Sequence, residues 1–193
     1  MPLLESLDKF KQEKPVVLLL GVYDGVHKGH QALIKKAKEI AALKKTKVLL
    51  ITFKNPPAQV LFPERKVELL CSFSERVRHL QEYGVDIICP LEFKKELAVL
   101  TAKQFFEIIA KKIPFTDLVI GFSATIGSDQ KNNRANIIKA AEELGFRVVE
   151  HFPVLQDELP ITSSRIRDLI AKESYNEAEA LLGHTLDNFK KRP

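Results

Sequence analysis

The residues best suited to chemistry are two histidines that are separated by a lysine and a glycine. His27 and His30 lie in GVYDGVHKGH, residues 21–30, which directly follows an apolar stretch. If a helix begins here, the two imidazoles lie one turn apart on the same side, beside backbone N–H groups that have no partner within the helix. A helix start of this kind binds anions, and phosphate in particular. The pattern therefore predicts a phosphate site with two imidazole donors.

Other interpretations of this segment were weighed against that prediction. Gly21, Gly25 and Gly29 allow a ligand to approach the backbone closely, but their spacing fits neither a dinucleotide-binding loop nor a Walker A loop. A zinc site needs a third and a fourth ligand, and no nearby cysteine, histidine or carboxylate has a suitable spacing. Two histidines placed by chance at a helix start remain an alternative.

A second segment, ITSSRIR at residues 161–167, has similar potential. It precedes an apolar helical pattern, so the hydroxyls of Ser163 and Ser164 lie at the entrance of a predicted helix. Arg165 and Arg167 add guanidinium groups, whose fork of N–H donors matches the oxygens of a phosphate. The alternative is an ordinary helix cap that is followed by two solvent-exposed arginines.

These two segments need a scaffold, and the rest of the chain predicts alternating strands and helices. Apolar runs predict five strands, at residues 16–22, 47–53, 85–91, 117–122 and 146–152. Helical spacing predicts helices at residues 29–44, 72–84, 101–112 and 133–145, and two short helices that begin after Thr162 and Ser174. Capping-box patterns support three of these helix starts: Ser72 with Glu75, Thr101 with Gln104, and Ser174 with Glu177.

This order of elements predicts an α/β fold, with a five-stranded parallel sheet and helices on both of its faces. In such sheets, ligands bind beyond the carboxyl ends of the strands. We therefore expect the loops at residues 23–30, 54–66 and 123–132 to lie along one rim and to form the site.

Length and composition indicate one globular domain. The chain has 193 residues, of which 45% are hydrophobic and 28% are charged, and this suits a single domain with its own core. Cys71 and Cys89 are too few for a disulfide framework, which favours a reducing compartment. No apolar run is long enough to span a membrane, and residues 1–15 lack the apolar segment of a signal peptide. We therefore expect a cytoplasmic protein with no membrane partner.

The formal net charge of +5 is concentrated in one short region. Residues 28–47 contain seven lysines and one glutamate. Such a stripe attracts polyanions, but a solvated helix face explains it equally simply. Because no aromatic or Arg-Gly pattern of an RNA-binding module accompanies it, no nucleic-acid partner is expected.

Taken together in their order, these motifs resemble a known family. GVYDGVHKGHQ and ITSSRIR are similar to the signature motifs of the HxGH nucleotidyltransferase superfamily. More narrowly, the chain resembles the prokaryotic FAD synthetase family, namely the FMN adenylyltransferase domain of bifunctional riboflavin kinase/FAD synthetases. Further counterparts of that family's motifs follow in the expected order at residues 52–57, 84–86, 119–127, 145–146 and 181–183.

The resemblance implies a Rossmann-like nucleotidyltransferase fold that transfers the adenylyl group of ATP to FMN and gives FAD and pyrophosphate. It implies that His27 and His30 are catalytic, that Mg²⁺ accompanies ATP, and that the protein supplies no dedicated metal ligand. Residues 1–193 are then expected to be a single FMN adenylyltransferase domain, without a riboflavin kinase domain, and a monomer or weak oligomer. The residues expected to bind ATP are Gly21, Val22, Tyr23, Asp24, Gly29, Ser163, Ser164, Arg165 and Arg167.

Two loops depart from the family pattern on the side expected to bind the flavin. Pro56 stands where the family has a histidine, and residues 123–127 lack the aspartate, the arginine and both phenylalanines of the family motif. Asn55, Ser123 and Thr125 are the candidates for FMN contacts in these loops. The departures keep two alternatives open: an adenylyl- or cytidylyltransferase with another phosphorylated acceptor, and a degenerate nucleotide-binding protein.

Overall fold

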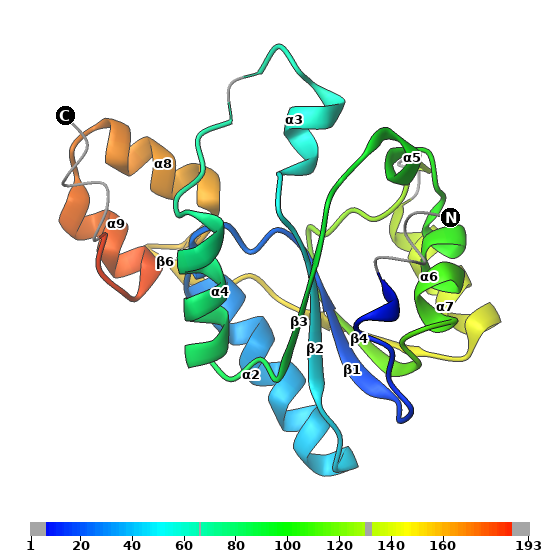
Figure 1. Ribbon diagram of the computed structural model, residues 1–193. Helices are drawn as coiled ribbons and strands as arrows, with labels where there is room; N and C mark the ends of the chain where they lie inside the picture. The colour runs from blue at the N-terminus through cyan, green and yellow to red at the C-terminus, as the bar shows by residue number, and fades with distance from the viewer. Residues whose placement is uncertain (1–6, 66, 130–132, 187–193) are drawn as a thin grey trace.

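Five parallel strands form one sheet at the centre of the computed structural model, which describes residues 7–65, 67–129 and 133–186 (Figure 1). The strands are β1 (Val16–Leu20), β2 (Val48–Phe53), β3 (Ile87–Leu91), β4 (Phe115–Gly121) and β5 (Arg147–His151). Their order in the sheet is β3-β2-β1-β4-β5. The chain therefore runs outward from β1 to one edge and then crosses to the other side of β1. Such a reversal, here between β1 and β4, is where ligands of open α/β sheets bind.

Helices cover both faces of the sheet, so the predicted α/β architecture is confirmed (Figure 1). The covering helices are α2 (Lys28–Lys44) and α4 (Phe73–Glu82) on one face, and α6 (Ala102–Ala110) and α7 (Asn133–Leu144) on the other. The short helices α3 (Pro57–Leu61) and α5 (Lys95–Ala98) follow β2 and β3. None of the helices in the described ranges is long and apolar enough to cross a membrane.

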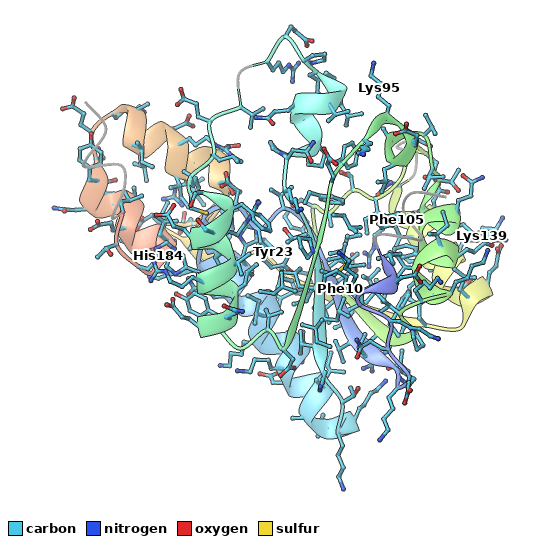
Figure 2. All side chains as sticks on the ribbon, in the orientation of Figure 1. Phe10, Tyr23, Lys95, Phe105, Lys139 and His184 are labelled. Carbon is cyan, nitrogen blue, oxygen red and sulfur yellow. The ribbon has the colours of Figure 1, made fainter. Side chains whose placement is uncertain are left out.

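The apolar strand sequences follow from this arrangement, because each central strand is buried on both faces. In β1, Val17 and Leu19 belong to the core beneath α2 and α4, whereas Leu18 belongs to the core beneath α6 and α7. All three side chains are fully buried. Tyr23 lies on the α4 side of the sheet and Phe105 on the α6 side (Figure 2).

The C-terminal part of the described chain forms a separate apolar cluster. A small antiparallel hairpin, β6 (Leu155–Gln156) and β7 (Leu159–Pro160), leads into the helix pair α8 (Ser163–Ala171) and α9 (Tyr175–Leu182). Their apolar faces pack on Leu70, which precedes α4. This packing fixes residues 161–167 at the carboxyl end of the sheet, against the loop that follows β1.

The predicted strands and the four longer predicted helices occur within two residues of their expected bounds. Ser72 and Thr101 form the predicted capping boxes with Glu75 and Gln104. The box predicted at Ser174 is wrong: the residue precedes α9, but its hydroxyl makes no capping hydrogen bond. Its ψ of 57° is not the extended conformation from which a capping side chain reaches back to the helix.

Four local features were not predicted: the β6–β7 hairpin, the 3-10 helix η1 (Asp24–Val26) and the short helices α3 and α5. Each is too short for hydrophobic periodicity to reveal it. Parts of the second and third predicted rim loops, residue 66 and residues 130–132, lie outside the described residues.

Candidate functional site

Two cavities meet at the carboxyl end of β1. The large cavity has a volume of about 1150 Å³ and the small cavity about 270 Å³. Loops that follow β1, β2, β3 and β4 line the large cavity, together with the start of α8. The small cavity lies against the start of α2 and the segments after β4 and β5. The residues that line both cavities are Leu20, Gly21, Val22, Tyr23, His30 and Ala124.

The two predicted histidines lie together at this wall, where His30 lines both cavities and His27 lines the small one. The rings of His27 and His30 stack with their centroids 3.7 Å apart and an angle of 20° between planes. Tyr23 continues the group, with its ring centroid 4.7 Å from that of His30. The Nδ1 atoms of both histidines are buried and have no hydrogen-bond partner among the described residues.

Burial keeps both imidazoles neutral at neutral pH. It lowers the pKa of His27 to about 4, and the nearby charge of Arg167 acts in the same direction. Burial also lowers the pKa of His30 well below its ordinary value, with further contributions from His27 and Arg76. Each neutral imidazole carries one N–H donor. The pair can therefore donate hydrogen bonds to an anion at pH 7 without itself being ionised.

The loop that carries these histidines adopts an unusual backbone. Tyr23 and Val26 have positive φ angles, 54° and 39°, which side chains other than glycine rarely adopt. Gly25, with φ of 75°, cannot be replaced without a clash, since an added Cβ would lie 2.8 Å from Leu70 and 3.1 Å from Leu182. The loop is therefore held in place by its surroundings, as strained segments at functional sites commonly are.

Asp24 joins this loop to the second predicted segment. One of its carboxylate oxygens accepts a hydrogen bond of 2.9 Å from the backbone of Leu70, and the other accepts one of 2.7 Å from Arg167. Its backbone carbonyl accepts a hydrogen bond from the hydroxyl of Ser163. Burial raises the pKa of Asp24, and the charge of Arg167 opposes this effect. Asp24 thus holds the starts of α2 and α8 in one site.

Gln31 is a second link that sequence reasoning left without a role. Its side-chain amide donates to the carbonyl of Val26 at 2.8 Å and to that of Leu182 at 2.7 Å. It therefore ties the histidine loop to the end of α9. Only its position in the motif GVYDGVHKGHQ could have drawn attention to it, because its partner lies about 150 residues away in the sequence.

The structure brings most of the predicted nucleotide-binding residues to the two cavities. Ser163, Ser164 and Arg167 line the large cavity, and Gly29 lines the small one. Arg167 also donates from Nε to the carbonyl of Glu68. Its guanidinium is thereby fixed at the cavity wall.

Arg165 does not join this group, contrary to what its place in the motif predicts. It lines neither cavity. Its Nη1 donates to the carbonyls of Gln156 and Leu159, and its Nη2 lies 3.5 Å from a carboxylate oxygen of Asp157. Because the guanidinium is taken up by the β6–β7 hairpin, its role in this structure is to hold that hairpin.

The three candidates for flavin contacts are separated. Thr125 lines the large cavity, whereas Ser123 lines the small one. Asn55 lines neither, because its side-chain amide forms two hydrogen bonds of 2.9 Å with the backbone of Phe93. Pro56, the departure from the family pattern, does line the large cavity.

Aromatic side chains from several elements contribute to the large cavity. Phe53, Phe93 and Phe105 line it from β2, from the loop after β3 and from α6. Phe62, 43% exposed, adds a ring at the mouth, with the guanidinium of Arg65 4.6 Å from the ring centroid. Sequence reasoning did not single out these residues, since phenylalanine is far more often a core residue than a ligand contact.

No group of three or more histidine, cysteine, aspartate or glutamate side chains that could hold a metal ion occurs in the described part of the chain. The carboxylate of the histidine loop itself, that of Asp24, is already bonded to Leu70 and Arg167.

The parallel sheet of this order, with the start of α2 at its switch point, is an α/β nucleotidyltransferase-like fold. The family model of FAD synthetase matches residues 9–165. The chain belongs to the FAD synthetase family, whose members are nucleotidyltransferases.

The most similar relatives include two bifunctional riboflavin kinase/FMN adenylyltransferases. That of Escherichia coli is 27% identical over 187 residues, which cover 95% of this chain and 60% of the relative. That of Listeria monocytogenes is 31% identical over 170 residues, which cover 87% of this chain and 54% of the relative. The chain thus spans little more than half the length of these relatives.

Solved structures show the same fold. A crystal structure of a macrolide-efflux protein from Streptococcus pneumoniae matches with a TM-score of 0.83 and 30% identity, over 93% of this chain and 60% of the other. Thermotoga maritima TmcAL, bound with alpha-thio ATP, matches with a TM-score of 0.56 and 13% identity, over 86% of this chain and 52% of the other. The second match is a likeness of fold alone.

The neutral state of His27 predicts how stability depends on pH. In the unfolded chain its pKa returns to the ordinary value of 6.5, whereas in the folded protein it is about 4. Between these values the unfolded state binds a proton that the folded state does not, so the free energy of unfolding falls as the pH falls. One such group contributes at most about 1.4 kcal/mol per pH unit.

Urea unfolding between pH 7 and pH 4.5 measures this dependence in the wild type and in His27→Gln. We expect a shallower dependence in the variant, because one of the coupled protons has been removed. The substitution changes stability at every pH, so the slopes are compared and not the absolute values. Equal slopes would show that His27 titrates alike in both states.

Proposed function

We propose that this chain transfers the adenylyl group of ATP to FMN, which gives FAD and pyrophosphate. The observation that carries the proposal is the stacked pair His27–His30 at the start of α2, in the wall between two cavities. Two substrates that occupy neighbouring cavities can react only at the wall that the cavities share. Membership of the FAD synthetase family supports this choice of reaction.

The proposed arrangement places the adenosine of ATP in the small cavity, its phosphates at the shared wall and the adjoining part of the large cavity, and the acceptor in the rest of the large cavity. The phosphates of ATP then lie between the starts of α2 and α8, where unpaired backbone N–H groups, Ser163, Ser164 and Arg167 converge. The large cavity has room and aromatic walls for a flat ring system such as that of a flavin.

The proposed reaction is a single displacement. An oxygen of the FMN phosphate attacks the α-phosphorus of ATP, and the bond from that phosphorus to the oxygen bridging to the β-phosphorus breaks as pyrophosphate leaves. Negative charge shifts onto oxygens of the transferring and leaving phosphates. The N–H groups of neutral His27 and His30 stabilise that charge as preorganised donors, and no covalent enzyme intermediate is formed.

Mg²⁺ fits this scheme as a partner of ATP, because it keeps several waters and binds phosphate oxygens readily. When bound, it neutralises part of the charge on the phosphates. The side chains of the site favour such an ion carried by the substrate, since the Asp24 carboxylate is engaged by Arg167.

A second candidate is a nucleotidyltransferase that acts on another phosphorylated acceptor. One observation favours it: the side-chain amide of Asn55, which was expected to contact FMN, donates a hydrogen bond to the carbonyl of Phe93 and accepts one from its N–H group. The polar groups left for recognition in that region are few, with Thr125 among them.

A panel of acceptors separates the two candidates. Pyrophosphate release is measured with ATP or CTP and Mg²⁺, with FMN, riboflavin, nicotinamide mononucleotide, 4′-phosphopantetheine or glycerol 3-phosphate as the acceptor. We expect release with ATP and FMN only, and formation of FAD.

In His30→Ala the turnover should fall about 10²–10³-fold while the protein stays folded, since one preorganised donor has been lost.

Release with another acceptor and none with FMN would select the second candidate. Binding of ATP without release for any acceptor would point to a degenerate nucleotide-binding protein. Near-normal turnover of His30→Ala would remove this residue from the reaction.

The two arginines of the second segment provide a matched pair of variants. Arg167→Gln should weaken ATP binding about 10–100-fold, because a charged hydrogen-bonding group is lost from the cavity wall. Arg165→Gln should change the affinity less than about threefold and act mainly on stability, through the β6–β7 hairpin. Calorimetric titration with ATP measures both variants, and the opposite order of effects would place the phosphates next to Arg165.

A further inference from the structure

Arg76, in α4, is the largest of the fully buried side chains, with 1% of its surface exposed. Its Nη1 donates to the carbonyl of Val22 and its Nη2 to the carbonyl of Phe53, both at 2.8 Å. These carbonyls lie where the chain leaves β1 and β2 to enter the loops of the site. One side chain thus fixes the exits of two neighbouring strands.

The charge of this guanidinium has no direct counter-ion. Among the described residues no carboxylate forms an ion pair with Arg76, and its buried Nε has no hydrogen-bond partner. Burial lowers the pKa of Arg76, and the electrostatic effects of Cys71 and Asp24 oppose this. A guanidinium nevertheless remains charged in proteins. An unpaired buried charge is costly to folding, and an apolar side chain of similar size would avoid that cost.

The charge lies beside the proposed reaction centre. Val22, whose carbonyl Arg76 binds, lines both cavities together with His30. The charged and titratable groups around His30 are Tyr23 and His27 from its own loop, Arg76 from α4, and Arg167 from α8 beside His27. All four of these groups are neutral or cationic, and the one carboxylate of the same loop, that of Asp24, is bonded to Arg167.

We propose that Arg76 is a positioning residue for the adenylyl transfer proposed above, on which this inference rests. It fixes the exit of β1, which leads through Tyr23 to the loop before His30, and the exit of β2. Its uncompensated charge is balanced when the phosphates of the substrate enter the site. The cation also adds to the effect of burial, which keeps His30 in the neutral form that donates to those phosphates. The folding cost of the buried charge is thereby offset in the complex.

The test uses two readouts that do not need turnover. Histidine ring signals in NMR give the pKa of His30, assigned by comparison with His30→Gln, and calorimetry gives the affinity for inorganic pyrophosphate. In Arg76→Gln we expect the pKa of His30 to rise and pyrophosphate binding to weaken about tenfold or more. Arg76→Lys keeps the charge, so it should restore the pKa of His30 and much of the affinity. The control Arg78→Gln removes an exposed charge from the same helix, and both readouts should match the wild type.

A second pair of variants leaves Arg76 in place, in case Arg76→Gln does not fold. The half-buried ring of Phe73 lies 5.2 Å from the Arg76 guanidinium, at the first residue of α4. Phe73→Glu supplies the missing counter-ion at a helix position that favours a negative charge. Compared with Phe73→Gln, it should raise the pKa of His30 and weaken pyrophosphate binding.

The inference is overturned if both readouts in Arg76→Gln match those in Arg78→Gln, or if Phe73→Glu matches Phe73→Gln. A loss of activity shared equally by Arg76→Gln and Arg76→Lys, with the pKa of His30 unchanged, would show a purely structural role. If no acceptor supports turnover in the wild type, the proposed function fails, whereas these two readouts still report on Arg76.

Discussion

The site depends on the carboxylate of Asp24, which is bonded to Arg167 and to the backbone of Leu70. These two bonds hold together three segments that are far apart in the sequence: the loop after β1, the segment before α4 and the start of α8. They help to fix the distance between the start of α2 and the start of α8. Gln31 adds a second tie, from the same loop to α9, and the small apolar cluster around Leu70 excludes water from the junction. The large cavity is bounded on this side by the segments thus joined.

The loop after β1 is held in a state that its residues would not adopt alone. Tyr23 and Val26 have positive φ angles, His27 loses its charge through burial, and Arg76 is buried with no ion pair to any carboxylate of the described residues. Each of these features opposes folding. They occur within one small region, next to two cavities, while the sheet beneath consists of ordinary fully buried aliphatic side chains. A rigid apolar sheet thus supports a polar site that the isolated loop could not form.

The sequence was sufficient for the scaffold and for the close pairing of the two histidines. The apolar runs of β1 and β2 and the helical spacing of α2 depend on local pattern, and these elements were predicted correctly. The proximity of His27 and His30 could be predicted because it depends only on a spacing of three residues at a helix start. Arg165 and Asn55 could not be placed, because each is engaged by backbone carbonyls or amides of a loop whose course no local pattern reveals. Arg76 was not predicted to belong to the site for the same reason, since its partners lie at the ends of β1 and β2, elsewhere in the chain.

The central claim is that phosphates bind at the start of α2, against the histidine pair in the wall between the two cavities. A crystal structure of the protein with α,β-methylene-ATP, which cannot release pyrophosphate, tests it most directly. We expect the α-phosphate within hydrogen-bonding distance of a ring nitrogen of His27 or His30, the remaining phosphates near Ser163, Ser164 and Arg167, and the base in the small cavity. Nucleotide bound elsewhere on the molecule, with the histidine pair untouched, would contradict the account.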